Sequence, residues 1–202
     1  SGSWDTPRSM CDSMSFTDSY GPAVTPAYGG YKHYQMTVGR RSRASTVQLM
    51  RRVTEAHAAV RAYFHMCARV FRAIPRTLFM DNAPENRSED MMAVLTKFGC
   101  VPAYCPPHKG DSNLAEVYIR LVTRVARAML AQAGMGLKFW GYAVQHANWL
   151  RNRTPCGYNY RSMSPMHAET GDAPDMSRII PFGAMGNVHL PHGSRERARE
   201  EK

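Results

Sequence analysis

Residues 77–105 read TLFMDNAPENRSEDMMAVLTKFGCVPAYC, and they contain the clearest alternation of strand and helix in the chain. Thr77 to Met80 is a short apolar run that leads directly into Asp81. Ser88 to Phe98 begins with a residue type that caps helices, continues with two acidic residues and is followed by a glycine. Val101 to Cys105 is again short and apolar. Strands that alternate with helices in this way pack as a sheet with helices on its faces.

The region before this alternation is typical of three short strands. Residues 14–20 form the first expected strand, with Asp18 at its end. Tyr31 to Val38 is rich in aromatic and β-branched residues, and Ala44 to Leu49 is a shorter third strand. Glycine-containing turns separate the three segments, so we expect an antiparallel meander.

Three further segments have the three- and four-residue spacing of apolar side chains that is typical of helices. They are residues 53–73, 112–133 and 137–151, and in the last of them we expect Trp140 and Trp149 to lie in the core. The expected buried face of the longest helix consists of Leu114, Val117, Tyr118, Leu121, Val125 and Met129. The complete order is three strands, helix, strand, helix, strand, helix, helix. It predicts an α/β protein with a mixed five-stranded sheet flanked by helices.

The chain divides into one core and two flanking segments. Residues 1–13 are polar and poorly patterned, and we expect a flexible N-terminal arm. Residues 14–155 contain the predicted sheet and helices. Residues 156–202 are richer in Gly, Pro, Asn and Ser and form a C-terminal extension. Within it, Ile179 to Leu190 predicts a small β element, and Arg195 to Lys202 is a charged tail.

The composition favours a folded, basic protein. Apolar residues make up 44% of the 202, which suits a domain with a sizeable core. Lys and Arg outnumber Asp and Glu by 26 to 16, giving a formal charge of +10. This excess suggests nucleic acid as a partner before an anionic membrane, although a merely soluble basic surface explains it equally well. Five scattered cysteines without a CxxC pair indicate a reducing compartment. No apolar run approaches the roughly 20 residues of a membrane span.

Three acidic residues occupy positions from which they can meet. Asp18 and Asp81 end the first and fourth strands, which can be neighbours in such a sheet, and Glu116 lies near the start of the helix 112–133. Three packed carboxylates repel one another unless a cation lies between them. Mg²⁺ prefers hard oxygen ligands, and two ions about 4 Å apart can assist phosphoryl displacement. Each acid taken singly is more often a turn, cap or surface residue.

The residues around these acids follow a recurring set of motifs. Asp18 begins Asp-Ser-Tyr-Gly-Pro, Asp81 begins Asp-Asn-Ala-Pro-Glu, and Glu116 ends Asn-Leu-Ala-Glu. Further on, Ala-Met-Leu-Ala-Gln-Ala-Gly and Lys-Phe-Trp-Gly-Tyr-Ala-Val occupy residues 128–144. In order and spacing these motifs resemble the integrase of copia-type (pseudovirus) retrotransposons, within the retroviral integrase superfamily. The resemblance covers roughly residues 16–192.

The resemblance implies a fold and an activity. The expected element order is that of the ribonuclease H-like fold, which this family has. The family's enzymes are polynucleotidyl transferases: water first frees a 3′ hydroxyl near the end of the element's DNA, and that hydroxyl then attacks target DNA. By this resemblance Asp18, Asp81 and Glu116 are the catalytic residues and the ligands of two Mg²⁺ or Mn²⁺ ions. Asp18 would bridge both ions, while Asp81 and Glu116 would each hold one.

The resemblance also implies partners and contacts. Double-stranded DNA, from the element's ends and from the target, is the expected partner, the core is expected to form homo-oligomers, and the nucleus is the expected place of action. Arg120, Arg124 and Arg127 fall on the same side of the helix as Glu116, where they could contact phosphates or simply form a solvated face. Lys109 belongs to a segment similar to the mobile loop beside an integrase active site. We expect no membrane contact.

Departures from the family pattern keep alternatives open. Ala83 replaces the usual Gly after Asp-Asn, Asn86 stands where an aromatic residue is common, and Val117 replaces an expected Arg. They indicate a divergent element, and a decayed or domesticated core that binds DNA without catalysis stays an alternative. Another nuclease or transposase on the same fold is a second alternative. A basic scaffold fragment without any site is a third.

Overall fold

The computed structural model describes residues 14–71, 73–104, 113–177 and 179–186. The predicted N-terminal arm, the charged tail and Lys109 therefore lie outside the described residues.

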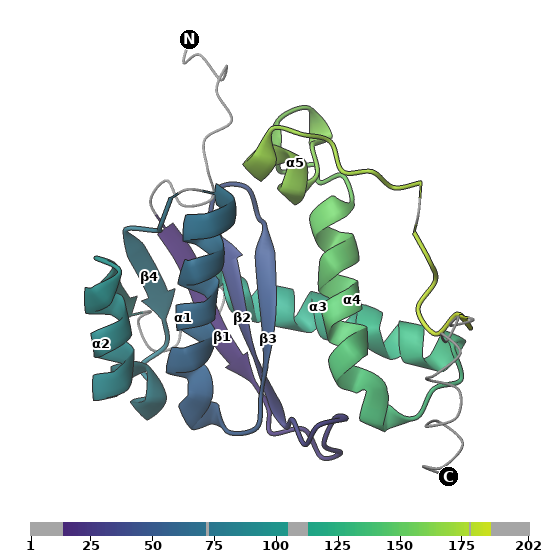
Figure 1. The fold of residues 1–202 in the computed structure, drawn as a ribbon, viewed down its shortest axis with the longest axis horizontal. Coiled ribbons are helices and arrows are strands. Elements are labelled where there is room, and N and C mark those ends of the chain that lie inside the picture. Colours follow the sequence, from purple (N-terminus) through teal and green to yellow (C-terminus); the bar gives the residue numbers. More distant parts are fainter. Residues whose placement is uncertain (1–13, 72, 105–112, 178, 187–202) are drawn as a thin grey trace, which may run out of the picture.

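A five-stranded sheet forms the centre of the molecule (Figure 1). Its strands are β1 (Met14–Tyr20), β2 (His33–Gly39), β3 (Ser45–Met50), β4 (Thr77–Met80) and β5 (Val101–Tyr104). Their order across the sheet is β3-β2-β1-β4-β5. The pairs β1–β2 and β2–β3 are antiparallel, whereas β1–β4 and β4–β5 are parallel. The predicted meander and mixed five-stranded sheet are confirmed, and the first and fourth strands are neighbours.

One face of the sheet is covered by α1 (Ala56–Met66) and α2 (Glu89–Lys97) (Figure 1). A 3-10 turn, Val53–Glu55, leads into α1, and a π-helical turn, Cys67–Phe71, follows it. The Ser88 hydroxyl caps α2 as predicted, since its oxygen accepts a hydrogen bond from the Met91 amide at 3.2 Å. The apolar faces of both helices and of the sheet enclose the first hydrophobic core.

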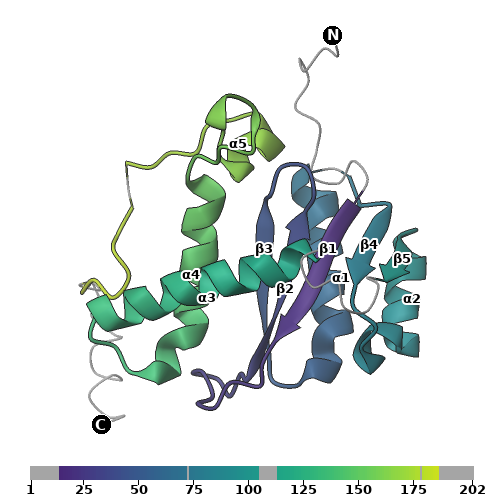
Figure 2. The same cartoon turned by 180° about the vertical axis from the view of Figure 1, so that it is seen from behind.

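The other face is covered by α3 (Leu114–Gln132) and α4 (Trp140–Arg153), which enclose the second core (Figure 2). The predicted buried face of α3 is wrong in detail: Val125 is exposed, and the fully buried residues are Ala115, Tyr118, Ile119, Val122, Ala126 and Leu130. Alanine lets α3 approach closely, because its small side chain leaves room for the sheet and for α4. The larger residues at the flanks, such as Leu114 and Met129, are only partly buried.

The extension packs against α4 rather than against the sheet. It contains a 3-10 turn, Tyr160–Ser162, and α5, Pro165–Thr170, which the sequence analysis missed. The Ser164 hydroxyl accepts a hydrogen bond from His167 at 3.2 Å, and the Ser-Pro pair is a helix-start signal that could have revealed α5. The predicted β element from Ile179 is wrong over its described part, 179–186, which contains no strand. Proline and glycine interrupt this part, and no sheet edge receives it.

Two expectations from the composition can be compared with the structure. Among the described residues, no helix is both long enough and apolar enough to cross a membrane. Cys67, Cys100 and Cys156 form no disulfide with one another.

Candidate active site

The pairing of β1 with β4 brings two of the acids to the same level of the sheet. These strands run parallel, with Ser15 opposite Leu78 and Phe16 opposite Phe79. Two residues further along each strand, the same register sets Asp18 level with Asp81. Asp18 and Asp81 are far apart in sequence, but β1 and β4 are adjacent parallel strands, so the two acids come to the same end of the sheet.

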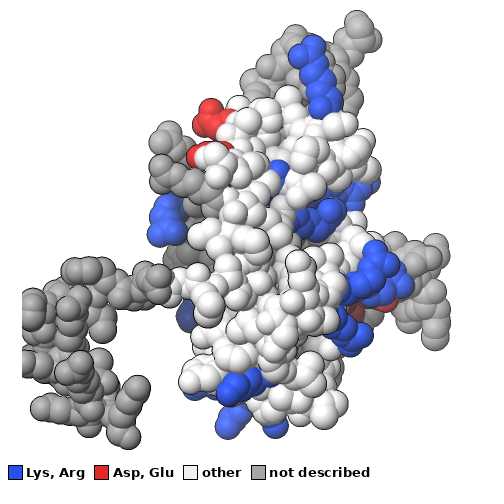
Figure 3. Space-filling model, turned by 90° about the vertical axis from the view of Figure 1, so that its right-hand side faces the viewer, with Lys and Arg blue, Asp and Glu red and all other residues white. Residues whose placement is uncertain are grey.

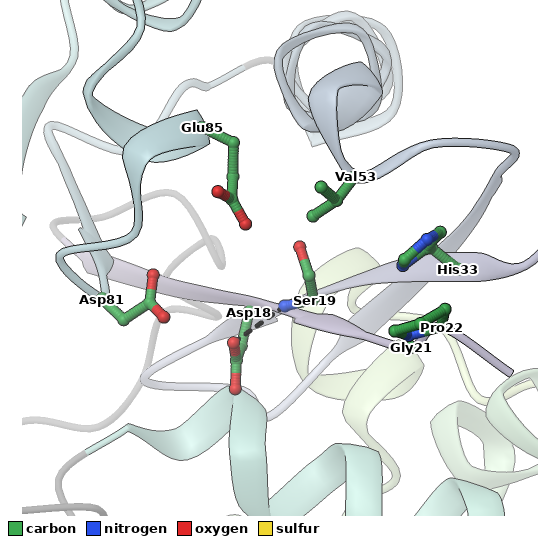
Figure 4. A pocket seen from close by; sticks show the side chains of 8 residues that line it. All are labelled: Asp18, Ser19, Gly21, Pro22, His33, Val53, Asp81 and Glu85. Atoms are coloured by element: carbon green, nitrogen blue, oxygen red, sulfur yellow. Dashed lines mark hydrogen bonds between the residues drawn. The ribbon is translucent and has the colours of Figure 1, made fainter.

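Asp18 lies within β1 rather than at its end. The strand continues to Tyr20, because Asp18 and the next residues remain paired with β2. Side chains alternate along a strand, and Figure 4 shows Asp18 pointing to the opposite side from Ser19. One carboxylate oxygen of Asp18 accepts a hydrogen bond from the Ser19 amide at 2.8 Å, which helps to fix the orientation of the carboxylate.

Asp81 is exposed directly after β4, and its neighbours in sequence hold its carboxylate. The same oxygen, Oδ1, accepts hydrogen bonds from the Asn86 side-chain amide at 2.6 Å and from the Ala83 amide at 3.3 Å. Asn86 is only 3% exposed, so its geometry is well constrained. The sequence showed Asn86 only as a departure from a family pattern. Its contact with Asp81 depends on the 3-10 turn Pro84–Arg87, which folds the chain back toward the carboxylate.

Glu116 is in the first turn of α3, and Asn113 fixes where that helix begins. The side-chain oxygen of Asn113, Oδ1, caps α3 by accepting a hydrogen bond from the Ala115 amide at 3.0 Å. Its side-chain nitrogen donates to the Thr17 carbonyl at 3.3 Å, one residue before Asp18. A single buried side chain thus ties the start of α3 to β1. An asparagine before an apolar helical pattern is a capping signal in the sequence. The hydrogen bond from Asn113 to Thr17 could not be predicted from the sequence, because it joins distant residues.

The three acids are close enough to influence one another electrostatically. The pKa of Asp18 is raised to about 6, first because burial disfavours the charged carboxylate, and further because Asp81 and Glu116 are negatively charged. The Ser19 amide opposes this rise by donating to the charged form. The structure therefore brings the three predicted residues into one electrostatic group, and their catalytic role stays a prediction.

The three carboxylates are chemically suited to a divalent cation, but their side chains are not yet placed to hold one. Carboxylate oxygens are the hard ligands that Mg²⁺ and Mn²⁺ prefer. Among the described residues, however, no three His, Cys, Asp or Glu side chains are grouped as a ready-made metal site. Cation binding would therefore require the acidic side chains to draw together.

A pocket opens beside two of the acids (Figure 4). It is lined by Asp18, Ser19, Gly21, Pro22, His33, Val53, Asp81 and Glu85. Glu85, which the sequence analysis did not select, points into this pocket. Glu116 is not among the lining residues, so the pocket covers only part of the predicted site.

The predicted phosphate contacts are available on the surface. Arg120, Arg124 and Arg127 are all exposed on α3, beginning one helical turn after Glu116. On the side of the molecule shown in Figure 3, Lys and Arg side chains occupy several separate places and acidic side chains are few. The prediction for Trp149 is wrong: it is 38% exposed and stacks against His146, with its other contact made by the Arg153 guanidinium. Trp140 is partly buried and packs against the second core, as predicted.

Comparison with known proteins gives a consistent result for sequence and fold. No family model matches the chain. It is 25% identical over 185 residues to a retrovirus-related Pol polyprotein from transposon TNT 1-94 of Nicotiana tabacum. This match covers 89% of the chain but 14% of the polyprotein, so the chain spans a small part of that relative.

Solved integrase structures have the same fold. The catalytic core domain of HTLV-2 integrase in complex with magnesium, in its trimeric form, superposes with a TM-score of 0.58 at 14% identity, covering 80% of this chain and 99% of that one. A chain from the structure of the simian T-cell lymphotropic virus intasome in complex with PP2A regulatory subunit B56 gamma superposes with a TM-score of 0.62 at 15% identity, covering 89% of this chain and 60% of that one. The element order is thus that of the ribonuclease H-like integrase cores. Over most of its length the chain is thus similar in sequence to part of a retrovirus-related Pol polyprotein, and its fold is that of the retroviral integrase catalytic cores.

Proposed function

We propose that this chain cuts and joins DNA as a metal-dependent polynucleotidyl transferase. The observation that carries the proposal is that Asp81, directly after β4, and Glu116, in the first turn of α3, both lie near enough to Asp18 on β1 to act on its charge. Burial, together with the charges of Asp81 and Glu116, raises the pKa of Asp18, and such perturbed groups mark functional sites more often than the rest of a surface. The match to a transposon polyprotein supports DNA integration as the context.

Each acid would have a distinct task in this reaction. Asp18 on β1 and Asp81 directly after β4 line the same pocket, and Glu116 would complete the ligand set from α3. Mg²⁺ or Mn²⁺ held by these carboxylates would supply Lewis-acid activation of the attacking oxygen and charge stabilisation at the leaving oxygen. The Asn86 and Ala83 amides fix one oxygen of Asp81, so its other oxygen is the one presented to a ligand.

We further propose that the substrate is double-stranded DNA, that two cations are used, that the core works as a homo-oligomer, and that it acts in the nucleus. The exposed arginines of α3 would contact phosphates on either side of the scissile bond. The HTLV-2 core has been solved in dimeric as well as trimeric form. This variety among relatives supports an assembly without fixing its geometry.

A strand-transfer assay tests the catalytic proposal. Blunt and 3′-processed duplexes are incubated with the chain and Mg²⁺ or Mn²⁺, and joined products are resolved on a sequencing gel. We expect Asp18→Asn and Glu116→Gln to abolish joining, because each removes a carboxylate that holds the cation. Asp172→Asn, at an exposed site in the extension, is the matched control and should join normally. Equal product from all four proteins would reject the mechanism. Cleavage without joining on matched ends would instead indicate another nuclease of this fold.

A DNA-binding core without catalysis is the second candidate. It is favoured by the absence of a preformed three-residue metal site among the described residues. Titration with Mn²⁺, followed by electron paramagnetic resonance, separates the candidates. An active site should take up Mn²⁺ and lose it in Asp81→Asn, whereas a decayed core should show the same weak response in both proteins.

A further inference from the structure

Two arginines without an acidic partner among the described residues both lie close enough to Tyr118 of α3 to act on it electrostatically. Arg43 belongs to the turn between β2 and β3, and Arg151 lies in the last turn of α4. Among the residues that the structure describes, neither guanidinium forms an ion pair with a carboxylate. Two like charges beside the same side chain repel each other when no counter-charge is present, so their placement calls for an explanation.

In both arginines the Nε–H group is a buried hydrogen-bond donor without an acceptor among the described residues. The Nε atoms of Arg43 and Arg151 are shielded from solvent, and neither has a hydrogen-bond partner within the described part of the chain. Buried polar groups are nearly always satisfied, and an orphaned donor often marks the place of a bound ion. It is notable that two of the few such atoms belong to the same cluster of side chains.

A tyrosine completes this cluster. The Tyr118 hydroxyl, on α3, accepts a hydrogen bond from Arg151 Nη2 at 2.6 Å. Burial raises the pKa of Tyr118, so the hydroxyl keeps its own proton and can donate it to a ligand, while the nearby charges of Arg151 and Arg43 act in the opposite direction. Arg151 also lies against the Tyr118 ring, with its central carbon 4.3 Å from the ring centroid.

The surrounding structure holds the two guanidinium groups in position. The Arg43 guanidinium is stacked 3.7 Å over the Tyr158 ring, in the segment that follows α4. The turn that carries Arg43 is closed by hydrogen bonds from Gly39 to Ala44 and from Asn159 to the Ser42 carbonyl. Such a cluster is preorganised, and it draws on four separate parts of the chain.

We propose that Arg43, Arg151 and Tyr118 form a phosphate-binding site, distinct from the three carboxylates. Planar guanidinium groups match the oxygens of phosphate, and the tyrosine hydroxyl adds one more donor. A bound phosphate would satisfy both Nε donors and neutralise the paired charges. The proposal of a phosphate site depends only on these contacts. It depends on the proposed function as well only if the bound phosphate belongs to DNA.

Arginine side-chain NMR tests the site without metal, DNA or catalysis. Inorganic phosphate is titrated into the ¹⁵N-labelled chain at constant ionic strength, and the Nε–Hε cross-peaks are followed. We expect two cross-peaks, assigned by their loss in Arg43→Lys and Arg151→Lys, to shift and saturate with a single Kd. Absence of saturable shifts at these two peaks would overturn the proposal, whatever the strand-transfer assay shows.

Variants then separate a specific site from general attraction to positive charge. Tyr118→Phe removes only the hydroxyl and should weaken phosphate binding by about tenfold, the loss expected for one good hydrogen bond to a charged ligand. The double variant Arg61→Gln and Arg76→Gln removes two exposed charges elsewhere and should leave the Kd unchanged. If this control weakens binding as much as Tyr118→Phe does, the site is rejected.

A final arm identifies the source of the phosphate. A short DNA duplex is added to the phosphate-saturated chain. If the duplex displaces phosphate from the two Nε groups, the site holds a phosphate of the DNA backbone. If phosphate stays bound beside the duplex, the site takes a free phosphate or a small phosphorylated molecule. Either result supports the phosphate site and tells which ligand it serves.

Discussion

At the scale of single residues, Asp18 carries the largest conflict between stability and function. Burial and two acidic neighbours hold its pKa near 6, above the 3.8 that is usual for this side chain. Above pH 6 the folded protein therefore keeps a charge that its surroundings disfavour. Residues that bind a cation commonly destabilise the cation-free protein in this way, because the ligand is what compensates the charge.

We expect Asp18→Asn to stabilise the cation-free protein at pH 7. The raised pKa means that ionisation costs the folded state about 3 kcal/mol there, and asparagine removes this cost. The folded state binds the proton more tightly, so the advantage of the variant should shrink as the pH falls from about 6 toward 4 and the wild-type carboxyl becomes protonated. Urea unfolding in EDTA at three pH values measures it. Asp172→Asn should show no such trend, and a variant less stable than wild type at pH 7 would contradict the expectation.

At the scale of elements, the beginning of α3 connects local capping with the site. Asn113 both caps the helix and donates to the Thr17 carbonyl beside Asp18. The helix start is consequently positioned by contacts that do not involve the Glu116 side chain. This arrangement would let the acid change its rotamer on binding a cation while its backbone stays in place.

We expect Asn113→Ala to lower both stability and joining activity. Loss of the cap and of the buried hydrogen bond should cost roughly 1–3 kcal/mol in the free energy of unfolding. Ser164→Ala removes the comparable cap of α5, far along the chain, and serves as the control. Both variants are assayed for joining at a temperature where urea curves show them folded. Equal activity of the two would mean that Asn113 acts on stability alone.

Several elements were predictable because their signals are local. Strand β4 begins and ends at the residues that the sequence predicted, Thr77 and Met80. Ser88 caps α2, as its residue type suggested. The buried face of α3 was not predictable from the larger side chains alone. The alanines of α3 are buried because α4 and the sheet pack against the side of the helix that carries them. The spacing of apolar residues along a helix does not show how closely other elements will approach it.

At the scale of the whole molecule, the sheet separates two cores and two kinds of surface. The acids lie at one edge of the sheet, while α3 crosses the sheet and carries its exposed arginines away from them (Figure 2). The formal charge of +10 is thus combined with a local concentration of negative charge. A polyanion would be attracted to the molecule in general, but it would approach the acids only with cations present.

We expect the DNA affinity to fall steeply with salt, and the α3 arginines to account for part of the slope. Changing Arg120, Arg124 and Arg127 to Gln should reduce the slope of log K against log salt by roughly 2 to 3, if each contacts one phosphate. Fluorescence anisotropy with a labelled duplex measures it in EDTA. Changing Arg61, Arg69 and Arg76 to Gln, which are exposed on or next to the α1 face, removes the same charge. If both triple variants give the same slope of log K against log salt, the reduction comes from the lost net charge and not from phosphate contacts of the α3 arginines.

The sequence by itself determined the kinds of elements, most of their boundaries and the three candidate acids, because strand alternation, helix caps and motif spacing are written in neighbouring residues. The tertiary structure decided which strands adjoin, that Asn86 holds Asp81, that Asn113 reaches β1, and that Arg43 and Arg151 both lie near Tyr118. These contacts join residues whose spacing along the chain carries no periodic signal. They form only when the helices bury the two apolar faces of the sheet and so bring the elements together. The free energy of that packing comes from many residues across the whole molecule.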